Sequence, residues 1–252
     1  MEVLKPDWPA PPNIHSLVTT RDGGTSLPPF SSLNLGDHVG DDAQAINANR
    51  AILRTQLPSD PIWLKQLHGT VVSIPMSRKF LSGQVIEADA AVTNQANEVL
   101  VVMTADCLPI LFSNQTGDVV GVAHAGWRGL CAGVLENTVT EMLKFSAGMS
   151  DNNLMAWMGP AIGPEAFEVG EDVYVAFLNA GIAFPTNAFI AIPSRPGKYF
   201  ANLYILAQSR LSALGIGQIY GGNFCTVSDH KRFFSHRRDA ISGRFASLIW
   251  FT

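Results

Sequence analysis

The amino-acid sequence predicts an α+β fold in which helices cover a system of mixed β-sheets within one domain. Short apolar runs rich in valine and isoleucine fill the centre of the 252-residue chain, and most helical patterns come later, so strands and helices do not alternate strictly. Hydrophobic residues make up 47% of the chain and charged residues 15%, which is a globular composition. No repeat, low-complexity tract or linker divides residues 1–252.

The first elements lie in the N-terminal quarter. Two proline-rich stretches frame a predicted strand, Ile14–Thr19. Ala43–Leu57 carries apolar residues at near-helical spacing, follows Asp41 and Asp42, and precedes Pro58. Since aspartate can cap the start of a helix and proline stops one, this segment is the first predicted helix.

Valine- and isoleucine-rich apolar runs of strand length follow. They are Ile62–Leu67, Val71–Ile74, Ala90–Thr93, Val99–Thr104, Leu108–Phe112 and Val119–Ala123. Leu130–Phe145 is predicted as one helix because its apolar residues form a face. The remaining predicted elements are strand Leu154–Met158, helices Asp172–Ala180 and Leu203–Leu214, and strands Ile219–Tyr220 and Phe245–Trp250.

Charge and cysteine content restrict the possible partners and the compartment. The net charge is −4 and the pI is near 5.8, which weighs against nucleic acid or an anionic membrane as a partner. Three cysteines do not form a disulfide framework and indicate a reducing compartment. No signal-peptide pattern is present, and no apolar run approaches the roughly 20 residues of a membrane span. We therefore expect a cytoplasmic protein.

Three candidate metal ligands, His68, Cys107 and His124, each stand at the carboxyl end of a predicted strand. If these strands are neighbours that run the same way, the side chains can converge, as sites do in α/β proteins. Two imidazoles and one thiolate are a known ligand set for catalytic zinc, whose fourth position stays open. A single histidine at a strand end is more often structural, so spacing alone leaves both interpretations open. Untested candidates for a fourth ligand are Cys131, Cys225, His230 and His236.

A glycine-containing turn, His124-Ala125-Gly126-Trp127-Arg128-Gly129, leads from a predicted strand into a predicted helix. Its glycines permit a tight turn, free amides at a helix start attract anions, and Arg128 adds a guanidinium suited to phosphate. The alternative is an ordinary strand-to-helix turn with a solvated arginine. The adjacent candidate ligand favours the anion site.

Two aspartates and a C-terminal arginine cluster have open roles. Asp106, beside Cys107, could orient a ligand or act as an acid or base, or it could be a turn aspartate that accepts backbone amides. Asp89 raises the same choice. The cluster consists of Arg237, Arg238 and Arg244. It could form a phosphate pocket or an interface, although a salt-bridged turn is the simpler interpretation.

Several ordered motifs run along nearly the whole chain. They are Ser32–Gly36, His38–Asp41, Trp63–Gly69, Ala88–Thr93, Thr104–Pro109, His124–Gly129, Gly159–Ile162 with Phe167–Val169, and Arg237–Asp239 with Gly243–Arg244. In this order they resemble the YfiH-like family, also called the laccase-domain or multicopper polyphenol oxidase family. The resemblance implies one catalytic domain over residues 1–252, with a four-layer α/β/β/α arrangement of mixed sheets between helices.

The resemblance also implies function. The family's metal ligands fall on His68, Cys107 and His124. Its members are associated with phosphorolysis of purine nucleosides (adenosine, inosine and methylthioadenosine) and with adenosine deamination; a polyphenol oxidase label and a role in peptidoglycan editing are attached to it too. We therefore expect a small-molecule enzyme with one catalytic zinc ion and with purine nucleosides and phosphate as substrates.

Roles for individual residues follow from this expectation. Zinc lowers the pKa of water towards about 7, which suits attack on C6 of adenine. Asp106 is expected to shuttle the proton and Arg128 to hold phosphate against the ribose. The positions of Asn34 and Gln66 in the motifs suggest that they line the substrate pocket.

Three alternatives stay open at this point. Cys107 could be the nucleophile of a metal-free hydrolase with His124 as its base, acting on an amide in a cell-wall precursor. A copper oxidase is a poorer fit, because multicopper oxidation needs several linked sites and the chain has six scattered histidines. The zinc could also be structural, in a binding module without enzymatic activity.

Overall fold

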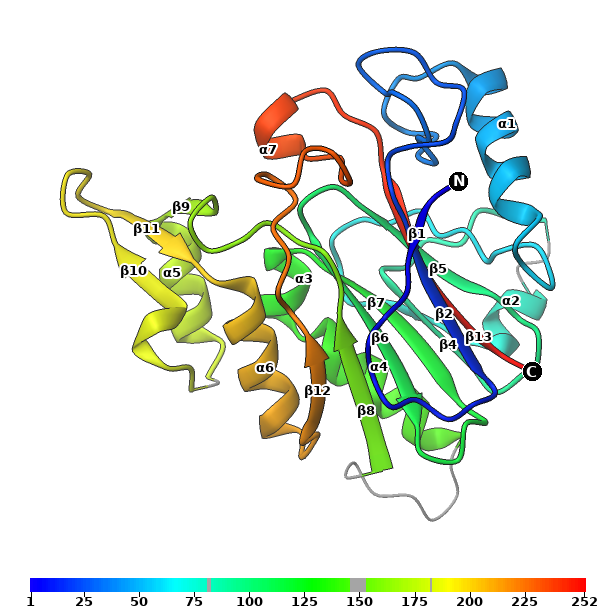
Figure 1. Cartoon of the computed structure of the whole chain (residues 1–252). Helices are drawn as coiled ribbons and strands as arrows, with labels where there is room; N and C mark the ends of the chain where they lie inside the picture. Colours follow the sequence, from blue (N-terminus) through cyan, green and yellow to red (C-terminus); the bar gives the residue numbers. More distant parts are fainter. Residues whose placement is uncertain (81–82, 146–152, 182) are drawn as a thin grey trace.

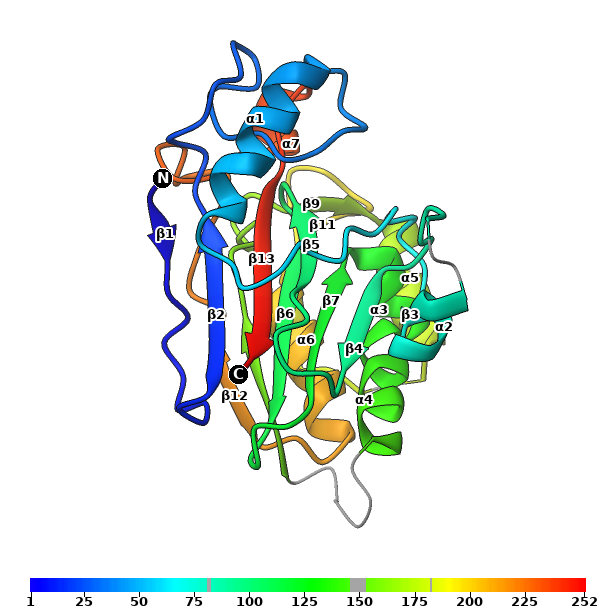
Figure 2. The same cartoon turned by 90° about the vertical axis from the view of Figure 1, so that its right-hand side faces the viewer.

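Two β-sheets pack face to face, and helices cover their outer faces (Figures 1 and 2). The computed structural model describes residues 1–80, 83–145, 153–181 and 183–252. The predicted α+β class, with mixed sheets between helices, is confirmed. Within the described residues, no helix has the length and apolar character of a bilayer span.

The first sheet has four antiparallel strands among the described residues. In spatial order they are β1 (Val3–Leu4), β2 (Ile14–Thr19), β13 (Phe245–Phe251) and β5 (Leu100–Thr104). Helix α1 (Ala43–Arg54) packs on its outer face, where Leu53 joins an apolar cluster with Val101. The α1 helix begins as predicted, because Asp42 accepts the backbone N–H of Ala45. It ends at Arg54, three residues short of the predicted Leu57.

The second sheet has six strands in the described part of the chain, antiparallel at its centre and parallel at both edges. In order they are β12 (Gln218–Gly221), β8 (Leu154–Met158), β6 (Leu108–Asn114), β7 (Val120–Ala125), β4 (Ala90–Thr93) and β3 (Val72–Ser73). Its outer face packs against α3 (Trp127–Ala132), α4 (Val134–Lys144) and α6 (Leu203–Ala213). The short helix α2 (Pro75–Phe80) lies near β3 (Figure 2).

Two predicted elements are wrong. The single helix Leu130–Phe145 is broken at Gly133, whose φ of +103° is left-handed backbone that glycine adopts readily. Ile62–Leu67 forms no strand but only isolated bridges at Ile62 and Lys65. Beyond these bridges, the side chain of Gln66 in this segment pairs with the backbone of β5.

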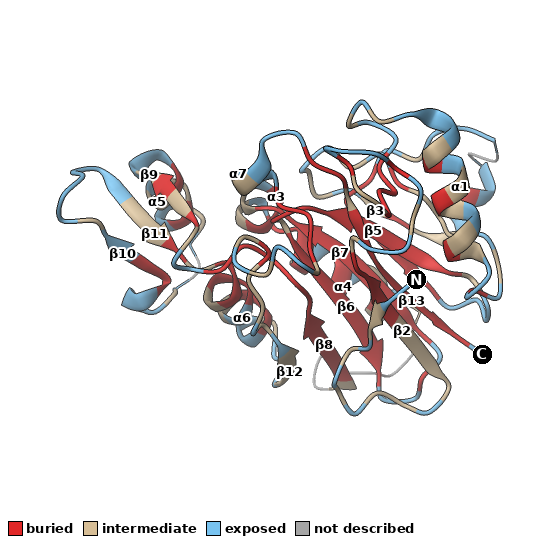
Figure 3. Ribbon diagram, turned by 45° about the horizontal axis from the view of Figure 1, so that its top comes forward, coloured by how far each residue is buried: buried red, intermediate tan, exposed pale blue. Residues whose placement is uncertain are grey.

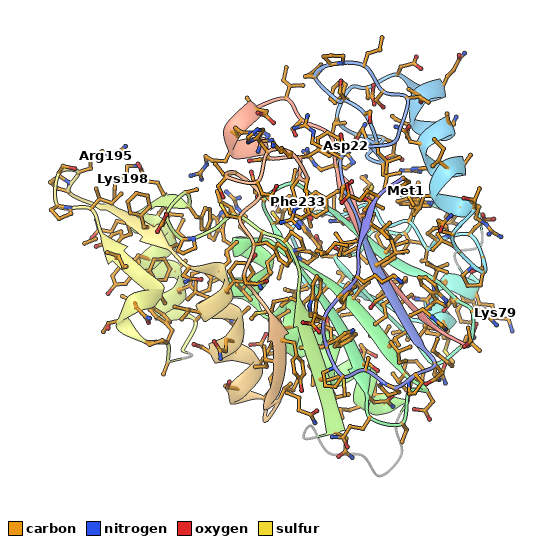
Figure 4. The ribbon with its side chains drawn as sticks, viewed as in Figure 1. Met1, Asp22, Lys79, Arg195, Lys198 and Phe233 are labelled. Atoms are coloured by element: carbon orange, nitrogen blue, oxygen red, sulfur yellow. The ribbon has the colours of Figure 1, made fainter. Side chains whose placement is uncertain are left out.

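A small sheet with one helix projects from the side of the molecule (yellow in Figure 1). Its elements are β9 (Glu168–Gly170), α5 (Glu171–Asn179), a short 3₁₀ helix (Thr186–Ala188), β10 (Phe189–Ala191) and β11 (Lys198–Ala201). The labelled side chains of Arg195 and Lys198 lie at its tip (Figure 4). These three strands, together with β1, α2 and α7 (His236–Asp239), were not predicted because they are too short to show a period.

The core between the two large sheets is closed and apolar. Its fully buried residues include Phe233, labelled in Figure 4, and Phe245, while Trp157 is 2% exposed. Figure 3 shows buried residues concentrated in the strands of both sheets. The candidate ligands lie at one end of this core.

Candidate metal centre

Antiparallel pairing brings Cys107 and His124 together. Strand β6 begins beside the place where β7 ends, and Pro109 pairs with His124. Alternation along β7 puts His124 on the same face as Val122, towards the core between the sheets, and leaves it 3% exposed. Cys107 lies in the turn that carries the chain from β5 in one sheet to β6 in the other. The sequence predicted neighbouring strands that run the same way. Instead, an antiparallel strand pair and a turn between the two sheets bring Cys107 and His124 together.

The three predicted ligands meet. The Sγ atom of Cys107 lies 3.7 Å from Nε2 of His68, and the ligand atoms of His68, Cys107 and His124 all lie within 4.8 Å of one another. Tetrahedral zinc, with Zn–S near 2.3 Å and Zn–N near 2.0–2.1 Å, would separate sulfur from nitrogen by about 3.6 Å. The donor set and its spacing therefore fit a zinc ion. Among the described residues, no second group of three or more histidine, cysteine or carboxylate side chains lies close enough together to hold a metal.

Asp89 positions both histidines with one buried carboxylate. One oxygen, Oδ1, lies 2.8 Å from Nδ1 of His124 and accepts the backbone N–H of His68 at 2.8 Å. The other, Oδ2, accepts the backbone N–H groups of Leu67 at 3.1 Å and Gly69 at 2.7 Å. Burial by itself would raise the pKa of Asp89, but these hydrogen bonds lower it below its usual value. The carboxylate thus orients His124 so that Nε2 can serve as the ligand atom.

The charges of the centre favour a thiolate. Burial alone would raise the pKa of Cys107, but the charge of His124 and hydrogen bonds from both histidines lower it to about 6. Burial alone would lower the pKa of His124, but Cys107 and Asp89 raise it to about 9. Since the thiolate is the metal-binding form of cysteine, Cys107 is prepared for a cation.

The backbone around the ligands is tightly packed. His68 has a φ of +61°, a left-handed conformation that is uncommon outside glycine and recurs at functional sites. A Cβ on Gly126 would lie 2.9 Å from Sγ of Cys107 and 2.9 Å from Cδ2 of His68. A Cβ on Gly129 would lie 2.7 Å from the carbonyl oxygen of Gly69. The two glycines of the turn therefore let helix α3 pack directly against the ligands and their loop.

Asp106 shapes the turn that carries Cys107. Its φ is +92°, and its carboxylate accepts the hydroxyl of Thr226 and the backbone N–H of Arg237, both at 2.6 Å. Its backbone carbonyl accepts the N–H of Ile162. One of these donors is a backbone amide, as the turn-aspartate alternative expects, and proton transfer by Asp106 stays a prediction.

Asn34 and Gln66 hold loops in place. Asn34 is fully buried, with its amide bonded to Gly36, Asp41 and the backbone N–H of Arg244. Gln66 makes two 2.8 Å hydrogen bonds to the backbone of Met103 on β5. Gln66 lines a cavity of about 520 Å³ that also contains His38 and Trp63. Substrate contacts by Asn34 and Gln66 stay predictions.

The predicted anion-binding arginine, Arg128, is exposed. Its guanidinium stacks on Trp127, with the guanidinium carbon 4.4 Å from the centre of the indole ring. Arg238 forms an ion pair with Asp239, which agrees with the salt-bridged turn considered from the sequence. Arg237 donates to the carbonyls of Ala166 and Glu168 and so ties α7 to the base of the small sheet.

Arg244, the third arginine of the C-terminal cluster, lies within electrostatic range of the centre. Burial lowers the pKa of Arg244, whereas the nearby charges of Cys107 and Asp106 act in the opposite direction. Its guanidinium donates to the carbonyls of Ser242 and Gly243, and among the described residues it has no carboxylate ion-pair partner. Sequence reasoning placed Arg244 in a cluster without linking it to the centre; its position in a motif near the C-terminus was the only signal.

A small cavity opens beside Cys107. It has a volume of about 150 Å³. It is lined by Ala105, Asp106, Cys107, Trp127, Ile162, Phe167, Leu203, His236 and Arg237. His68, by contrast, is exposed, so the centre is also open towards solvent.

Comparison with known proteins identifies the family. Residues 15–252 match the family described as multi-copper polyphenol oxidoreductase laccase. The chain belongs to this family. Within it, a Haemophilus influenzae protein named purine nucleoside phosphorylase is 51% identical over 258 residues, spanning 100% of both chains. The Escherichia coli purine nucleoside phosphorylase YfiH is 46% identical over 253 residues, covering 99% of this chain and 98% of its own.

Solved structures of the family share the fold. A Neisseria meningitidis protein is 45% identical, with a TM-score of 0.90 over 100% of this chain and 99% of its own. The Bacillus licheniformis YfiH is 31% identical, with a TM-score of 0.87 over 95% of this chain and 93% of its own. The resemblance to the YfiH-like family is confirmed.

Proposed function

We propose that this protein is a zinc-dependent purine nucleoside phosphorylase that also deaminates adenosine. The observation that carries the proposal is the His68, Cys107 and His124 cluster, which joins a buried ligand to an exposed one. A structural zinc site closes its fourth position with a protein ligand, whereas a catalytic site keeps that position open. The names of the relatives from Haemophilus influenzae and Escherichia coli support the choice of substrate.

Zinc is our preferred metal. His68, Cys107 and His124 would hold it, and the bound ion would act as a Lewis acid and lower the pKa of water. Multicopper oxidation needs several linked sites, and the described residues provide one such group.

For phosphorolysis, Arg244 is the stronger candidate to hold phosphate. It is partly buried, has no acidic ion-pair partner among the described residues, and lies within electrostatic range of Cys107. A guanidinium in such a place can form charge-assisted hydrogen bonds to phosphate. Arg128, the residue expected from the sequence, would have to leave its stack on Trp127 to do the same. Asp106 is retained as the candidate proton carrier for deamination.

Product analysis tests the proposal. Purified protein is incubated with adenosine, with and without phosphate, beside a Cys107→Ala variant, and products are identified by mass spectrometry. Adenine and ribose 1-phosphate formed only with phosphate would support phosphorolysis, and inosine would support deamination. Unchanged adenosine, or products that persist in the variant, would end the proposal.

A metal-free cysteine hydrolase is the second candidate, since the lowered pKa of Cys107 beside His124 is also a property of nucleophilic cysteines. Its substrate would be an amide in a cell-wall precursor. Activity that survives verified zinc removal but is lost on thiol alkylation would favour it over the zinc enzyme. The free thiols of Cys107, Cys131 and Cys225 agree with a reducing compartment such as the cytoplasm, which stays a prediction.

A further inference from the structure

The cavity beside Cys107 is large enough for only part of a nucleoside-sized ligand. Sites that bury a whole drug-sized ligand occupy about 300–1,000 Å³, whereas this one has about 150 Å³. It therefore takes one part of a nucleoside rather than all of it. Two of its walls are aromatic, Trp127 and Phe167, and Ile162 and Leu203 add aliphatic surface.

Several polar groups of this cavity are already engaged within the protein. Both carboxylate oxygens of Asp106 are hydrogen-bonded, and Nη1 of Arg237 donates to two backbone carbonyls. Among the described residues of the lining, Asp106, Cys107 and Arg237 make side-chain hydrogen bonds, whereas the His236 side chain makes none and forms no ion pair. His236 is exposed. The lining thus offers two aromatic side chains and one imidazole.

The walls are also held in place. Asp106 connects Thr226, Arg237 and Ile162 through its side chain and its backbone carbonyl. Arg128 stacks on Trp127 at 4.4 Å, and Arg237 lies over Phe167 at 5.4 Å. A preformed site of this kind loses little freedom on binding.

We propose that this cavity binds the purine base, with Trp127 as the stacking platform, Phe167 as the facing wall and His236 as a hydrogen-bonding partner for the edge of the base. Trp127 is then a specificity-determining residue that favours a flat bicyclic base. The inference rests on the proposed function, because it places the base of that substrate relative to the metal centre.

A second tryptophan–arginine stack supplies a matched control. Trp63 lines the separate cavity of about 520 Å³, and Arg50 stacks on it at 4.1 Å. If the base bound there, Trp63 rather than Trp127 would govern its affinity. The two tryptophans can be replaced in the same way and compared directly.

The test measures binding of free adenine, by calorimetric titration, to the zinc-loaded wild type and the variants Trp127→Ala, Trp127→Phe and Trp63→Ala. Stacking of one base on an aromatic side chain predicts a loss of about 5- to 150-fold in Trp127→Ala and less than about threefold in Trp127→Phe and Trp63→Ala. Zinc content and far-ultraviolet circular dichroism confirm that each variant is folded and loaded. Where adenosine is turned over, Trp127→Ala is expected to raise KM more than it lowers kcat.

Adenine binding that is absent from the wild type, unchanged in Trp127→Ala, or lost in Trp63→Ala instead would overturn the inference. The outcome is separable from that of the proposed function. Wild-type protein that binds adenine through Trp127 but turns over no nucleoside would uphold the base site and end the proposed reaction. Nucleoside turnover together with an adenine affinity that does not depend on Trp127 would uphold the proposed reaction and overturn the base site.

Discussion

Asp89 holds both histidines of the metal centre, and Asp89→Asn removes half of its acceptors while keeping its shape. One oxygen serves His124 and the backbone of His68, and the other serves the N–H groups of Leu67 and Gly69. An asparagine has one acceptor oxygen, so whichever way it turns, two of these donors face an NH₂ group instead.

The magnitude follows from the two lost acceptors. A buried donor without a partner costs about 1–3 kcal/mol, so the variant should lose about 2–6 kcal/mol of unfolding free energy. Loss of a hydrogen bond that orients a metal-binding histidine typically weakens metal affinity about 10- to 100-fold. We expect both effects, because the same carboxylate braces the loop of His68 and orients His124.

Zinc affinity is measured by competition with a chromophoric chelator, and stability by urea unfolding of the same preparations. Asp118→Asn is the matched control, because Asp118 accepts hydrogen bonds from Asn114 and Thr116 in the turn between β6 and β7 at the far end of the sheet. It should bind zinc like the wild type. Folded Asp89→Asn protein with zinc affinity within about twofold of the wild type would refute a positioning role for Asp89.

Three further predictions follow from the same geometry. In zinc-stripped protein, alkylation of Cys107 should rise with pH through a midpoint near 6, because the thiolate reacts and its pKa is lowered to about 6; a midpoint near 8.5 would contradict this. Gly126→Ala should weaken zinc binding by about tenfold or more because its Cβ would lie 2.9 Å from the Cys107 sulfur, whereas Gly217→Ala, with nothing within 4 Å, should not; equal affinities would count against the tight packing. Arg78→Met should lower the unfolding free energy by about 3 kcal/mol in urea because Glu98 loses its partner, and a loss below about 1 kcal/mol would show that the pair is not needed.

Strands were predictable where a short run of mainly apolar residues stood between polar or turn-forming residues. Ile14–Thr19, Ala90–Thr93 and Leu154–Met158 have the predicted bounds. Of the two failures, one depended on contacts distant in sequence and the other on a single backbone angle. The segment before His68 pairs with β5 through a glutamine side chain in addition to isolated bridges, and Gly133 divides a helix whose apolar period is unbroken.

The sequence by itself determined which residues could hold a metal, since only certain side chains offer soft or imidazole donors and the family motifs marked three of them. Tertiary structure decided that they meet, through an antiparallel pair and a crossing between sheets. It also decided the surroundings of the charged residues: Asp89 braces two ligands, Arg244 lies within electrostatic range of Cys107, and Arg128 stacks on Trp127. Residue type sets what a side chain can donate or accept, but its partners are set by chain segments tens to hundreds of residues away, which local pattern does not encode.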